Sequence, residues 1–154
     1  MENQVTVHPV HKEFIYLDDS SHAVKVQGNT IINTDLGILI HNGYDNELTQ
    51  NTVYGARSAS VNISESVLVP RLTVKNNTVK TNLFFPTKAS ATYRLYGAYD
   101  NNNFGTYNLN RYSSLYSTQL VNEDYKPGGV PTNAQFTLAG WQQKNVSTFP
   151  GLQT

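Results

Sequence analysis

The tripeptide Asn-Thr-Ile at residues 29–31 returns as Asn-Thr-Val at residues 51–53, and this recurrence limits the possible folds more than any other feature of the chain. In a wider form of the pattern, an apolar residue stands three positions before an Asn and another stands two positions after it. The wider pattern occurs with its Asn at Asn29, Asn51, Asn77 and Asn110. Repeats of about 20 to 50 residues are typical of folds whose backbone returns to the same place in every unit. The Asn residues are therefore candidates for one column on one surface.

Apolar residues separated by a single position form a second series that does not depend on the Asn residues. Its pairs are Ile15/Leu17, Ile38/Ile40, Val61/Ile63 and Tyr93/Leu95. Such alternation is typical of a β-strand with one buried face. The pairs follow one another at steps of 23, 23 and 32 residues, and the Asn residues at steps of 22, 26 and 33. Because the steps of both series become longer toward the C-terminus, we predict that both series belong to one structural repeat.

The repeat predicts an all-β solenoid, a parallel β-helix of about four rungs whose apolar pairs stack inward. Asn suits its corners, because it tolerates the left-handed conformation of a sharp bend and its amide can bond to the Asn of the next rung. We place the rungs at residues 14–112, between an N-terminal edge segment or incomplete rung at 1–13 and a capping tail at 113–154. The longer steps predict loops that include ISESVLVPR, FFPTKAS and GAYDNNNFG. The alternative is an antiparallel sandwich or jelly roll, which gives no reason for Asn at equivalent corners.

The composition agrees with strands and turns, and it argues against several functions. The 154 residues include 18 Asn, 10 Tyr and 10 Gly, and one short helix is predicted near 137–144, with Thr137 as its N-cap. The 11 basic and 11 acidic residues balance, so charge gives no reason to expect nucleic acid as a partner. No apolar run is long enough for membrane insertion, no Cys can form a disulfide, and the first residues lack the pattern of a signal peptide.

The stretch NTIINTDLGILIHNGYDNELTQNTVYG resembles the rungs of right-handed parallel β-helix proteins of the pectate-lyase-like superfamily. The order LTVKNNTVKT, YRLYGAYDNNNFGTYNLNRYSS and FTLAGWQQK resembles the last rung and helical cap of one group of these proteins, and the resemblance covers roughly residues 14–145. It implies a right-handed solenoid, polysaccharide as the ligand, and a location outside the cell or on a cell or virion surface. The superfamily includes lyases, hydrolases and epimerases, along with tailspikes and adhesins.

The resemblance leaves the activity open. The chain carries no motif of a specific lyase or hydrolase and shows fewer rungs than such proteins usually have, so it looks like the terminal part of a longer protein or one chain of an assembly. One hypothesis is a polysaccharide-processing enzyme in which this part supplies the end cap and part of a sugar groove. The other is a non-catalytic structural or adhesive module, such as a fibre, tailspike or surface protein. A sandwich-type carbohydrate-binding module remains only if the fold prediction fails.

If the apolar pairs point inward, their neighbours point outward and form two columns. The first column contains Tyr16, Leu39, Asn62 and Arg94. The second contains Asp18, His41, Ser64 and Tyr96. The candidates for substrate binding are Tyr16, Asn62, Arg94 and Tyr96, because tyrosine rings can stack on sugars and a guanidinium can pair with a carboxylate. Asp18 and His41, one rung apart, are the candidates for a general acid/base pair. The competing interpretation is a solvated outer face with incidental polar residues.

The other titratable residues suggest no further site. They are His8, His11 and His22 near the N-terminus, Asp35, Asp45 and Glu47 around the HNGYDNE bend, and Glu123 and Asp124 near the C-terminus. The histidines lack a third ligand at a suitable spacing, so we expect surface histidines and no metal site. The bend is a turn in which calcium has no supporting ligand motif, and no cofactor is expected. The last two carboxylates are assigned to a loop, without a partner acid for glycoside hydrolysis.

The two ends of the solenoid lead to different expectations. The last rung is expected to be closed by Tyr112, Tyr116, Phe136 and Trp141, because a terminal rung otherwise exposes apolar side chains and unpaired strand edges. At the first rung, Pro9 can blunt an edge strand but hardly covers a core. Residues 1–20 are therefore expected to meet upstream rungs or a partner chain, and the mass in solution would test this.

Overall fold

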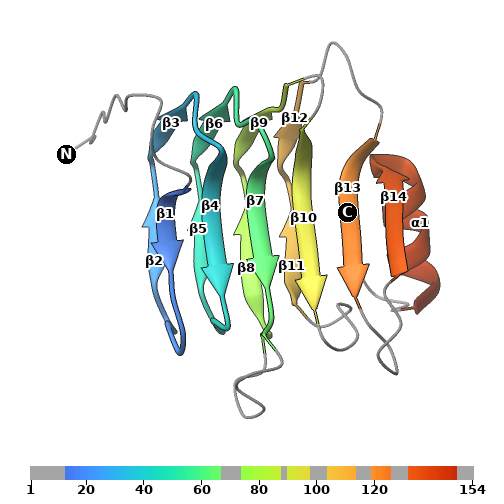
Figure 1. The fold of residues 1–154 in the computed structure, drawn as a ribbon, viewed down its shortest axis with the longest axis horizontal. Helices are drawn as coiled ribbons and strands as arrows, with labels where there is room; N and C mark the ends of the chain where they lie inside the picture. The colour runs from blue at the N-terminus through green and yellow to red at the C-terminus, as the bar shows by residue number, and fades with distance from the viewer. Residues whose placement is uncertain are drawn as a thin grey trace.

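In the computed structural model, the described residues are 13–66, 74–87, 90–97, 104–113, 119–125 and 132–148. Within them the chain forms strands β1 to β14 and one helix, α1, with the strands stacked along a common axis (Figure 1). The strands make three sheets, and each of the first four rungs supplies one strand to each sheet. The predicted all-β parallel β-helix of about four rungs is confirmed, and the sandwich alternative is wrong.

The first sheet has the order β1-β4-β7-β10-β13-β14. Its strands are β1 (Glu13–Leu17), β4 (Leu36–His41), β7 (Ala59–Ser64), β10 (Ala91–Gly97), β13 (Gln119–Tyr125) and β14 (Thr132–Thr137). The second sheet contains β2 (Lys25–Gln27), β5 (Glu47–Thr49), β8 (Asn77–Lys80) and β11 (Gly105–Asn108). The third contains β3 (Thr30–Ile32), β6 (Thr52–Tyr54), β9 (Leu83–Phe85) and β12 (Arg111–Tyr112). Neighbouring strands pair in parallel, except for the antiparallel pair β13 and β14.

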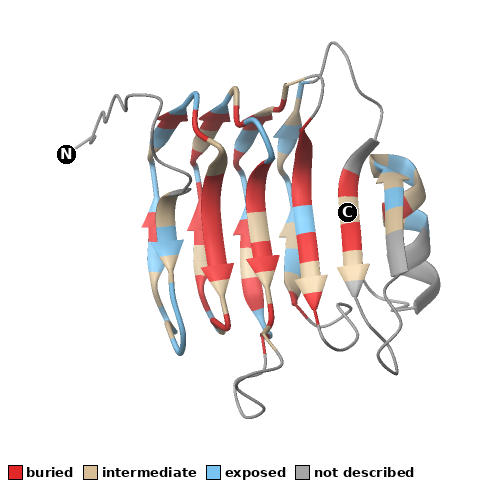
Figure 2. Cartoon of the chain, in the orientation of Figure 1, coloured by how far each residue is buried: buried red, intermediate tan, exposed pale blue. Residues whose placement is uncertain are grey.

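The register of the first sheet stacks the apolar pairs on one another. Ile15 lies opposite Ile38, Ile38 opposite Val61, and Val61 opposite Tyr93. The side chains of Ile38, Val61 and Tyr93 are fully buried, and the inner positions of the middle rungs form a continuous buried core (Figure 2). Burial of such a side chain contributes about 1.5–3 kcal/mol, so the stack of rungs carries the stability of the fold.

An Asn ladder follows the corner between the second and third sheets. The amide nitrogen Nδ2 of Asn29 donates to Oδ1 of Asn51 at 2.9 Å, Asn51 donates to Asn82 at 3.0 Å, and Asn82 donates to Asn110 at 2.9 Å. The left-handed residue is the one before each Asn, such as Gln50 with φ of 55°, and not the Asn itself. The Asn side chains thus close a sharp bend by bonding to the next rung rather than by adopting its strained conformation.

The predicted ladder needs one correction, because Asn77 belongs to a different corner. Asn46 donates to Oδ1 of Asn77 at 3.1 Å, at the corner between the first and second sheets. The two corners of a rung lie five residues apart, at Asn46 and Asn51 and again at Asn77 and Asn82. The sequence pattern fits both Asn residues of the third rung, since Val79 and Phe84 flank Asn82 in the same way. Spacing alone therefore selected the wrong one.

The helix α1 (Leu138–Thr148) follows β14 and covers the end of the solenoid (Figure 1). The hydroxyl Oγ1 of Thr137 accepts a hydrogen bond of 3.0 Å from the backbone N–H of Gly140, as predicted for an N-cap. Trp141 is buried, and its ring lies 4.9 Å from that of Tyr107 and 5.8 Å from that of Tyr93. Phe136 packs half-buried against the core. No helix among the described residues has the length and apolarity to cross a lipid bilayer.

Two parts of the chain assigned to loops or tail are strands. β13 pairs in parallel with β10, so the first sheet continues past residue 112 into the segment predicted as capping tail. Glu123 and Asp124 lie in this strand and not in a loop. Phe84, predicted within a loop, lies in β9 and is buried. Residues 1–12 and Tyr116 fall outside the described residues, as do parts of the three predicted loops, 67–73, 88–89 and 98–103.

Candidate functional site

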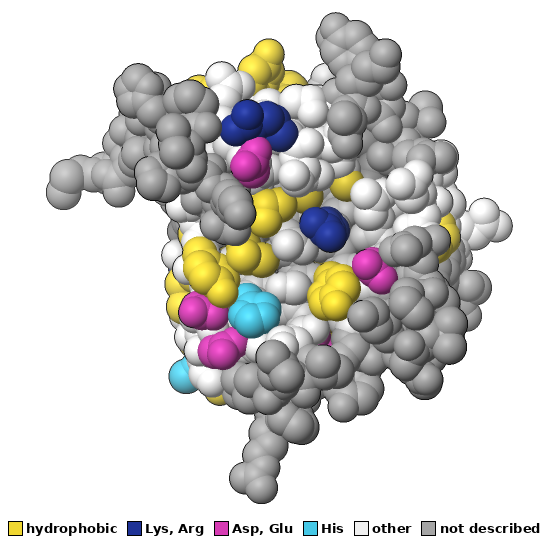
Figure 3. Space-filling view, viewed as in Figure 1, with side chains coloured by type: hydrophobic (Ala, Val, Ile, Leu, Met, Phe, Trp, Pro, Cys, Tyr) yellow, Lys and Arg dark blue, Asp and Glu magenta, His cyan; other side chains and the backbone are white. Residues whose placement is uncertain are grey.

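The outward face of the first sheet carries the predicted columns. Tyr16 lies opposite Leu39, Leu39 opposite Asn62, and Asn62 opposite Arg94. The row continues to Asn122 on β13, because Arg94 lies opposite this residue. Neighbouring strands in a sheet are about 4.8 Å apart, so the row presents one side chain about every 4.8 Å along the axis of the solenoid. Figure 3 shows this face, on which acidic, basic and histidine side chains are interspersed with polar and hydrophobic ones.

The second outward row lies two residues further along the strands. His41 lies opposite Ser64, Ser64 opposite Tyr96, and Tyr96 opposite Asp124. Arg94 and Tyr96 are therefore neighbours on one strand, with Asn122 and Asp124 beside them on the next. Asn122 and Asp124 were not predicted as members of these rows. The apolar-x-apolar signal fails at β13, because Glu123 takes the inward position that Leu95 holds one rung earlier.

Asp18 and His41, the predicted acid/base pair, are in contact. Nδ1 of His41 lies 3.3 Å from Oδ1 of Asp18 and 3.2 Å from Oδ1 of Asp19. The hydroxyl of Tyr16 donates to Oδ1 of Asp18 at 2.8 Å. The backbone N–H of Asp19, the Tyr16 hydroxyl and His41 all stabilise the ionised carboxyl and lower the pKa of Asp18. Tyr16 and Asp18 of the first rung therefore both contact the imidazole of His41 on the second rung.

Asp18, Asp19 and His41 are also the described residues that could together hold a metal ion. Each offers a ligand atom, and these atoms lie within 4.8 Å of one another. The buried amide of Asn42 donates to Oδ1 of Asp19 at 2.8 Å and holds that carboxylate in place. A half-buried imidazole between two exposed carboxylates is equally what a surface ion pair requires, so the geometry allows a cation without indicating one. Asp19 was not predicted, since it adjoins Asp18 and lies past the strand alternation.

A hollow of about 260 Å³ adjoins the other end of the face. It is lined by Ser58, Arg94, Asn122, Glu123, Asp124, Ala134 and Gln135. Among the described residues, the side chain of Arg94 has no hydrogen-bond or ion-pair partner, and it is exposed. A guanidinium presents five donors in a fork that suits carboxylate oxygens. Arg94 is therefore the residue at this hollow that could pair with an anion, and two acidic residues, Glu123 and Asp124, line the same hollow.

The other titratable candidates from the sequence that the structure describes have local partners. Asp35 pairs with Arg57 at 2.8 Å, and Glu47 pairs with Lys80 at 3.1 Å and with Lys25 at 3.5 Å. These pairs hold neighbouring turns and strands together. Asp45 has φ of 55° at the bend, accepts a hydrogen bond from Asn76, and so acts as a turn residue. The ring of His22 stacks on that of Tyr44 at 5.0 Å, whereas His8 and His11 lie outside the described residues.

A polar cluster lies inside the end of the solenoid. Glu123 is 3% exposed, and Nε1 of Trp141 donates to its Oε1 at 2.7 Å. Burial raises the pKa of the Tyr107 hydroxyl, and the nearby Glu123 carboxylate raises it further. Burial also raises the pKa of Tyr93, whose hydroxyl lies 2.8 Å from that of Tyr112. All three tyrosines stay neutral at physiological pH and serve the cap rather than acid/base chemistry.

The comparison with protein families agrees with this architecture. A family model described as a right handed beta helix region matches residues 3–116, well over half of the chain. The chain therefore belongs to the right-handed β-helix family. Searches of curated proteins and of solved structures find no match to it.

Proposed function

We propose that the outward face of the first sheet binds a polysaccharide that carries carboxylate groups. The observation behind this proposal is that the Arg94 side chain is exposed, has no partner among the described residues and borders the hollow, with Tyr96 two residues further along the same face of β10. A bidentate contact between the Arg94 guanidinium and a carboxylate would hold one sugar in place. The ring of Tyr96 would then give the next sugar of the chain an apolar surface to pack against. The chain would then act outside the cell or on a cell or virion surface.

The rows of the face extend this contact along the axis. Asn62 and Asn122 flank Arg94 on neighbouring strands, and both can hydrogen-bond to sugar hydroxyls. Tyr16 is 49% exposed at the far end of the same row. A glycan lying across the strands would meet an aromatic ring at each end and a cation near one of them. The face therefore supports binding of an extended chain rather than of a single sugar.

Binding can be measured by isothermal titration with polygalacturonate, alginate and hyaluronate, with dextran as the neutral polymer. We expect binding to at least one acidic polymer, weakened by salt, and a drop of about tenfold in affinity for Arg94→Ala. The affinity of Arg94→Lys should lie between those of the parent chain and Arg94→Ala, because lysine keeps the positive charge but cannot make the bidentate contact. Lys25→Ala, on the second sheet, is the matched control and should leave binding unchanged.

The proposal fails if no acidic polymer binds, or if Arg94→Ala and Lys25→Ala behave alike. Circular dichroism of each variant would establish that the fold is kept. Equal affinity for dextran and for the acidic polymers would also count against the guanidinium as the recognition element.

A second candidate function is cleavage of the bound polysaccharide, and the contact between Asp18 and His41 favours it. A carboxylate that orients an imidazole is an arrangement used in general acid/base chemistry. Release of reducing ends or unsaturated products by the chain, lost in Asp18→Ala and His41→Ala, would support it. If products appear and neither substitution affects them, this assignment of the catalytic pair is wrong. If none appear while binding persists, a non-catalytic structural or adhesive module is the better description.

A further inference from the structure

Exposed apolar side chains gather on a side of the solenoid that the proposed binding face does not use. Among the described residues, the large apolar or aromatic side chains that are exposed are Tyr16, Ile32, Tyr54, Leu83 and Leu109. Only Tyr16 lies on the first sheet. The other four lie on the third sheet or on the corner that leads into it. Scattered single apolar residues need no explanation, but a gathering on one narrow side indicates a contact surface.

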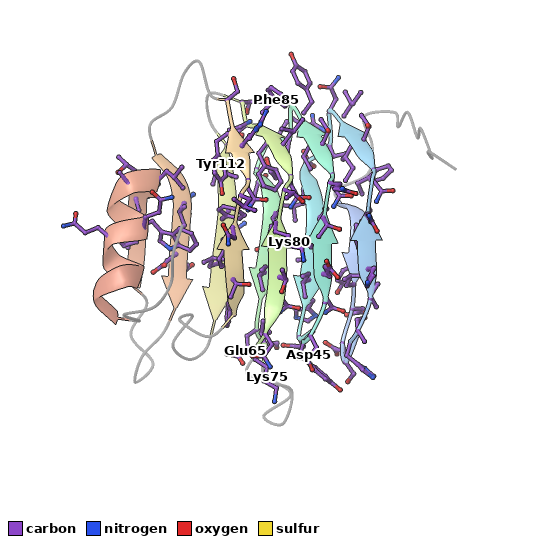
Figure 4. The ribbon with its side chains drawn as sticks, turned by 180° about the vertical axis from the view of Figure 1, so that it is seen from behind. Asp45, Glu65, Lys75, Lys80, Phe85 and Tyr112 are labelled. Atoms are coloured by element: carbon purple, nitrogen blue, oxygen red, sulfur yellow. The ribbon has the colours of Figure 1, made fainter. Side chains whose placement is uncertain are left out.

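The third sheet aligns these residues in a stripe across the rungs. Ile32 lies opposite Tyr54, and Tyr54 lies opposite Phe85. The rings of Tyr54 and Phe85 have their centroids 5.8 Å apart, and Tyr54 is 54% exposed. Figure 4 shows Phe85 at the margin of the solenoid, away from Lys80 on the second sheet. We call the stripe formed by Ile32, Tyr54 and Phe85 the aromatic stripe.

A groove runs beside the aromatic stripe at the corner of the Asn ladder. It has a volume of about 740 Å³ and is lined by three equivalent triplets from successive rungs, residues 50–52, 81–83 and 109–111. The first residue of each triplet, Gln50, Thr81 and Leu109, has φ between 53° and 55°, so each rung bends in the same way. The ladder residues Asn51 and Asn82 are buried at its base. The groove is therefore a product of the repeat.

The dimensions of this side favour a slender ligand. Strands of at most three residues span about 10 Å, and four strands at about 4.8 Å spacing extend over less than about 20 Å. The flat apolar area is then on the order of 200 Å², whereas a stable protein interface takes roughly 800 Å² from each partner. The groove volume lies within the range of about 300–1,000 Å³ that is usual for small-ligand sites. A second copy of the chain is too large a partner for this surface.

The backbone at the corner argues against an added peptide strand. The N–H groups of Thr52, Leu83 and Arg111 already donate to the preceding rung, at 2.8 Å in each case. Peptides that bind by strand addition need an unpaired sheet edge, and the groove runs across the rungs where the ladder is complete. Recognition here has to come from side chains.

The side chains suit an uncharged sugar chain. Gln50, Thr52 and Thr81 offer amide and hydroxyl groups, and Arg111 is the one charged residue among those lining the groove. Sugar rings have apolar C–H faces and polar edges, which match an aromatic stripe beside a polar groove. We propose that the groove and the aromatic stripe form a second glycan site, which binds one neutral oligosaccharide chain. This proposal does not rest on the acidic-polysaccharide site of the first sheet.

Titration with unbranched hexasaccharides of glucose, xylose and mannose tests the proposal on the whole chain, with backbone amide shifts as the readout. We expect one of them to bind and to shift amides at 50–54, 81–85 and 109–111. Tyr54→Ala should lower the affinity about tenfold, and Tyr54→Phe should restore most of it, since the ring face is kept. Tyr44→Ala is the matched control, a half-buried tyrosine that lines neither proposed site, and should leave hexasaccharide affinity unchanged.

Three results would overturn the proposal. One is that no hexasaccharide binds. Another is that Tyr54→Ala and Tyr44→Ala have the same effect on hexasaccharide affinity. The third is that Tyr54→Ala abolishes self-association seen by sedimentation, or abolishes binding of an apolar peptide, while sugars do not bind. Arg94→Ala should not affect hexasaccharide binding, so failure at this site is distinguishable from failure at the first sheet.

Discussion

The indole N–H of Trp141 donates a 2.7 Å hydrogen bond to the carboxylate of Glu123, inside the end of the solenoid. Glu123 occupies the inward column that Ile40, Ile63 and Leu95 hold in earlier rungs, so a carboxylate stands where the repeat calls for an apolar side chain. The helix α1 brings the indole to this position. The last rung is thus closed by an aromatic cap that also supplies a donor to a buried acid.

This bond predicts how the cap responds to substitution. Trp141→Phe keeps most of the packing but removes the donor, and should lower the free energy of unfolding by about 1–3 kcal/mol. Trp141→Ala should cost about 3–5 kcal/mol, because it also opens a cavity against Tyr93 and Tyr107. Urea denaturation followed by circular dichroism measures both. Gln143→Ala, exposed on the same helix, should stay within about 0.5 kcal/mol of the parent chain. Equal stability of Trp141→Phe and Gln143→Ala would show that the bond contributes nothing.

The Asn ladder predicts a second difference in stability. Asn51 is fully buried, donates to the carbonyl of Val26 at 2.9 Å and to Asn82 at 3.0 Å, and accepts from Asn29. Asn51→Ala removes these bonds and leaves buried groups unpaired, at a cost of roughly 2–4 kcal/mol. Asn51→Asp should cost at least as much at neutral pH, because a carboxylate cannot donate.

The control for the ladder is Asn108→Ala, which truncates an exposed Asn on β11. It should change the midpoint of urea denaturation little. Should Asn51→Ala be as mild as Asn108→Ala, the ladder would be a consequence of the fold rather than a source of its stability.

The carboxyl of Asp18 predicts a dependence on pH with a definite sign. Its pKa is lowered below 3.8 in the folded chain, first by the backbone N–H of Asp19 and then by Tyr16 and His41. A lowered folded-state pKa means that the ionised form stabilises the fold. This contribution is fully present above the unfolded pKa and is lost as the pH falls through the folded value. Tyr16→Phe and His41→Ala should each raise the pKa of Asp18 toward 3.8.

Carbon-13 shifts of the Asp18 carboxyl, followed between about pH 2 and 6, measure this pKa directly. Tyr54→Phe, which removes a tyrosine hydroxyl on the third sheet, should leave the pKa of Asp18 unchanged. A pKa that does not move in Tyr16→Phe or in His41→Ala would contradict the hydrogen bonds of this cluster.

The position of Gly37 in β4 is expected to tolerate no side chain. A Cβ there would lie 2.7 Å from Cγ1 of Val53 and would also meet the backbone carbonyl of Ser60. The backbone of the neighbouring rung cannot move away without breaking the ladder of the first sheet, so Gly37→Ala should cost about 1–3 kcal/mol or more. Thermal or urea unfolding measures this loss. A variant as stable as the parent chain would mean that the rungs can separate locally at little cost.

The repeat itself could be predicted from local sequence. The inward pair Val61 and Ile63 alternates with polar residues, and such alternation indicates which face of the strand is buried. The outward rows, from Tyr16 to Arg94, follow from the same alternation. The N-cap at Thr137 is local too, because its partner Gly140 lies three residues away.

Tertiary structure decided what depends on pairing between rungs. Spacing could not tell Asn77 from Asn82, since both fit the pattern, and only the register of the strands places Asn82 between Asn51 and Asn110. Nor could it place Glu123 inward, because that position breaks the apolar alternation and depends on a donor from Trp141, 18 residues further on. Where apolar and polar residues alternate, the local pattern indicates which way each side chain points. Its partner on the next rung is set by long-range hydrogen bonding, which no local pattern specifies.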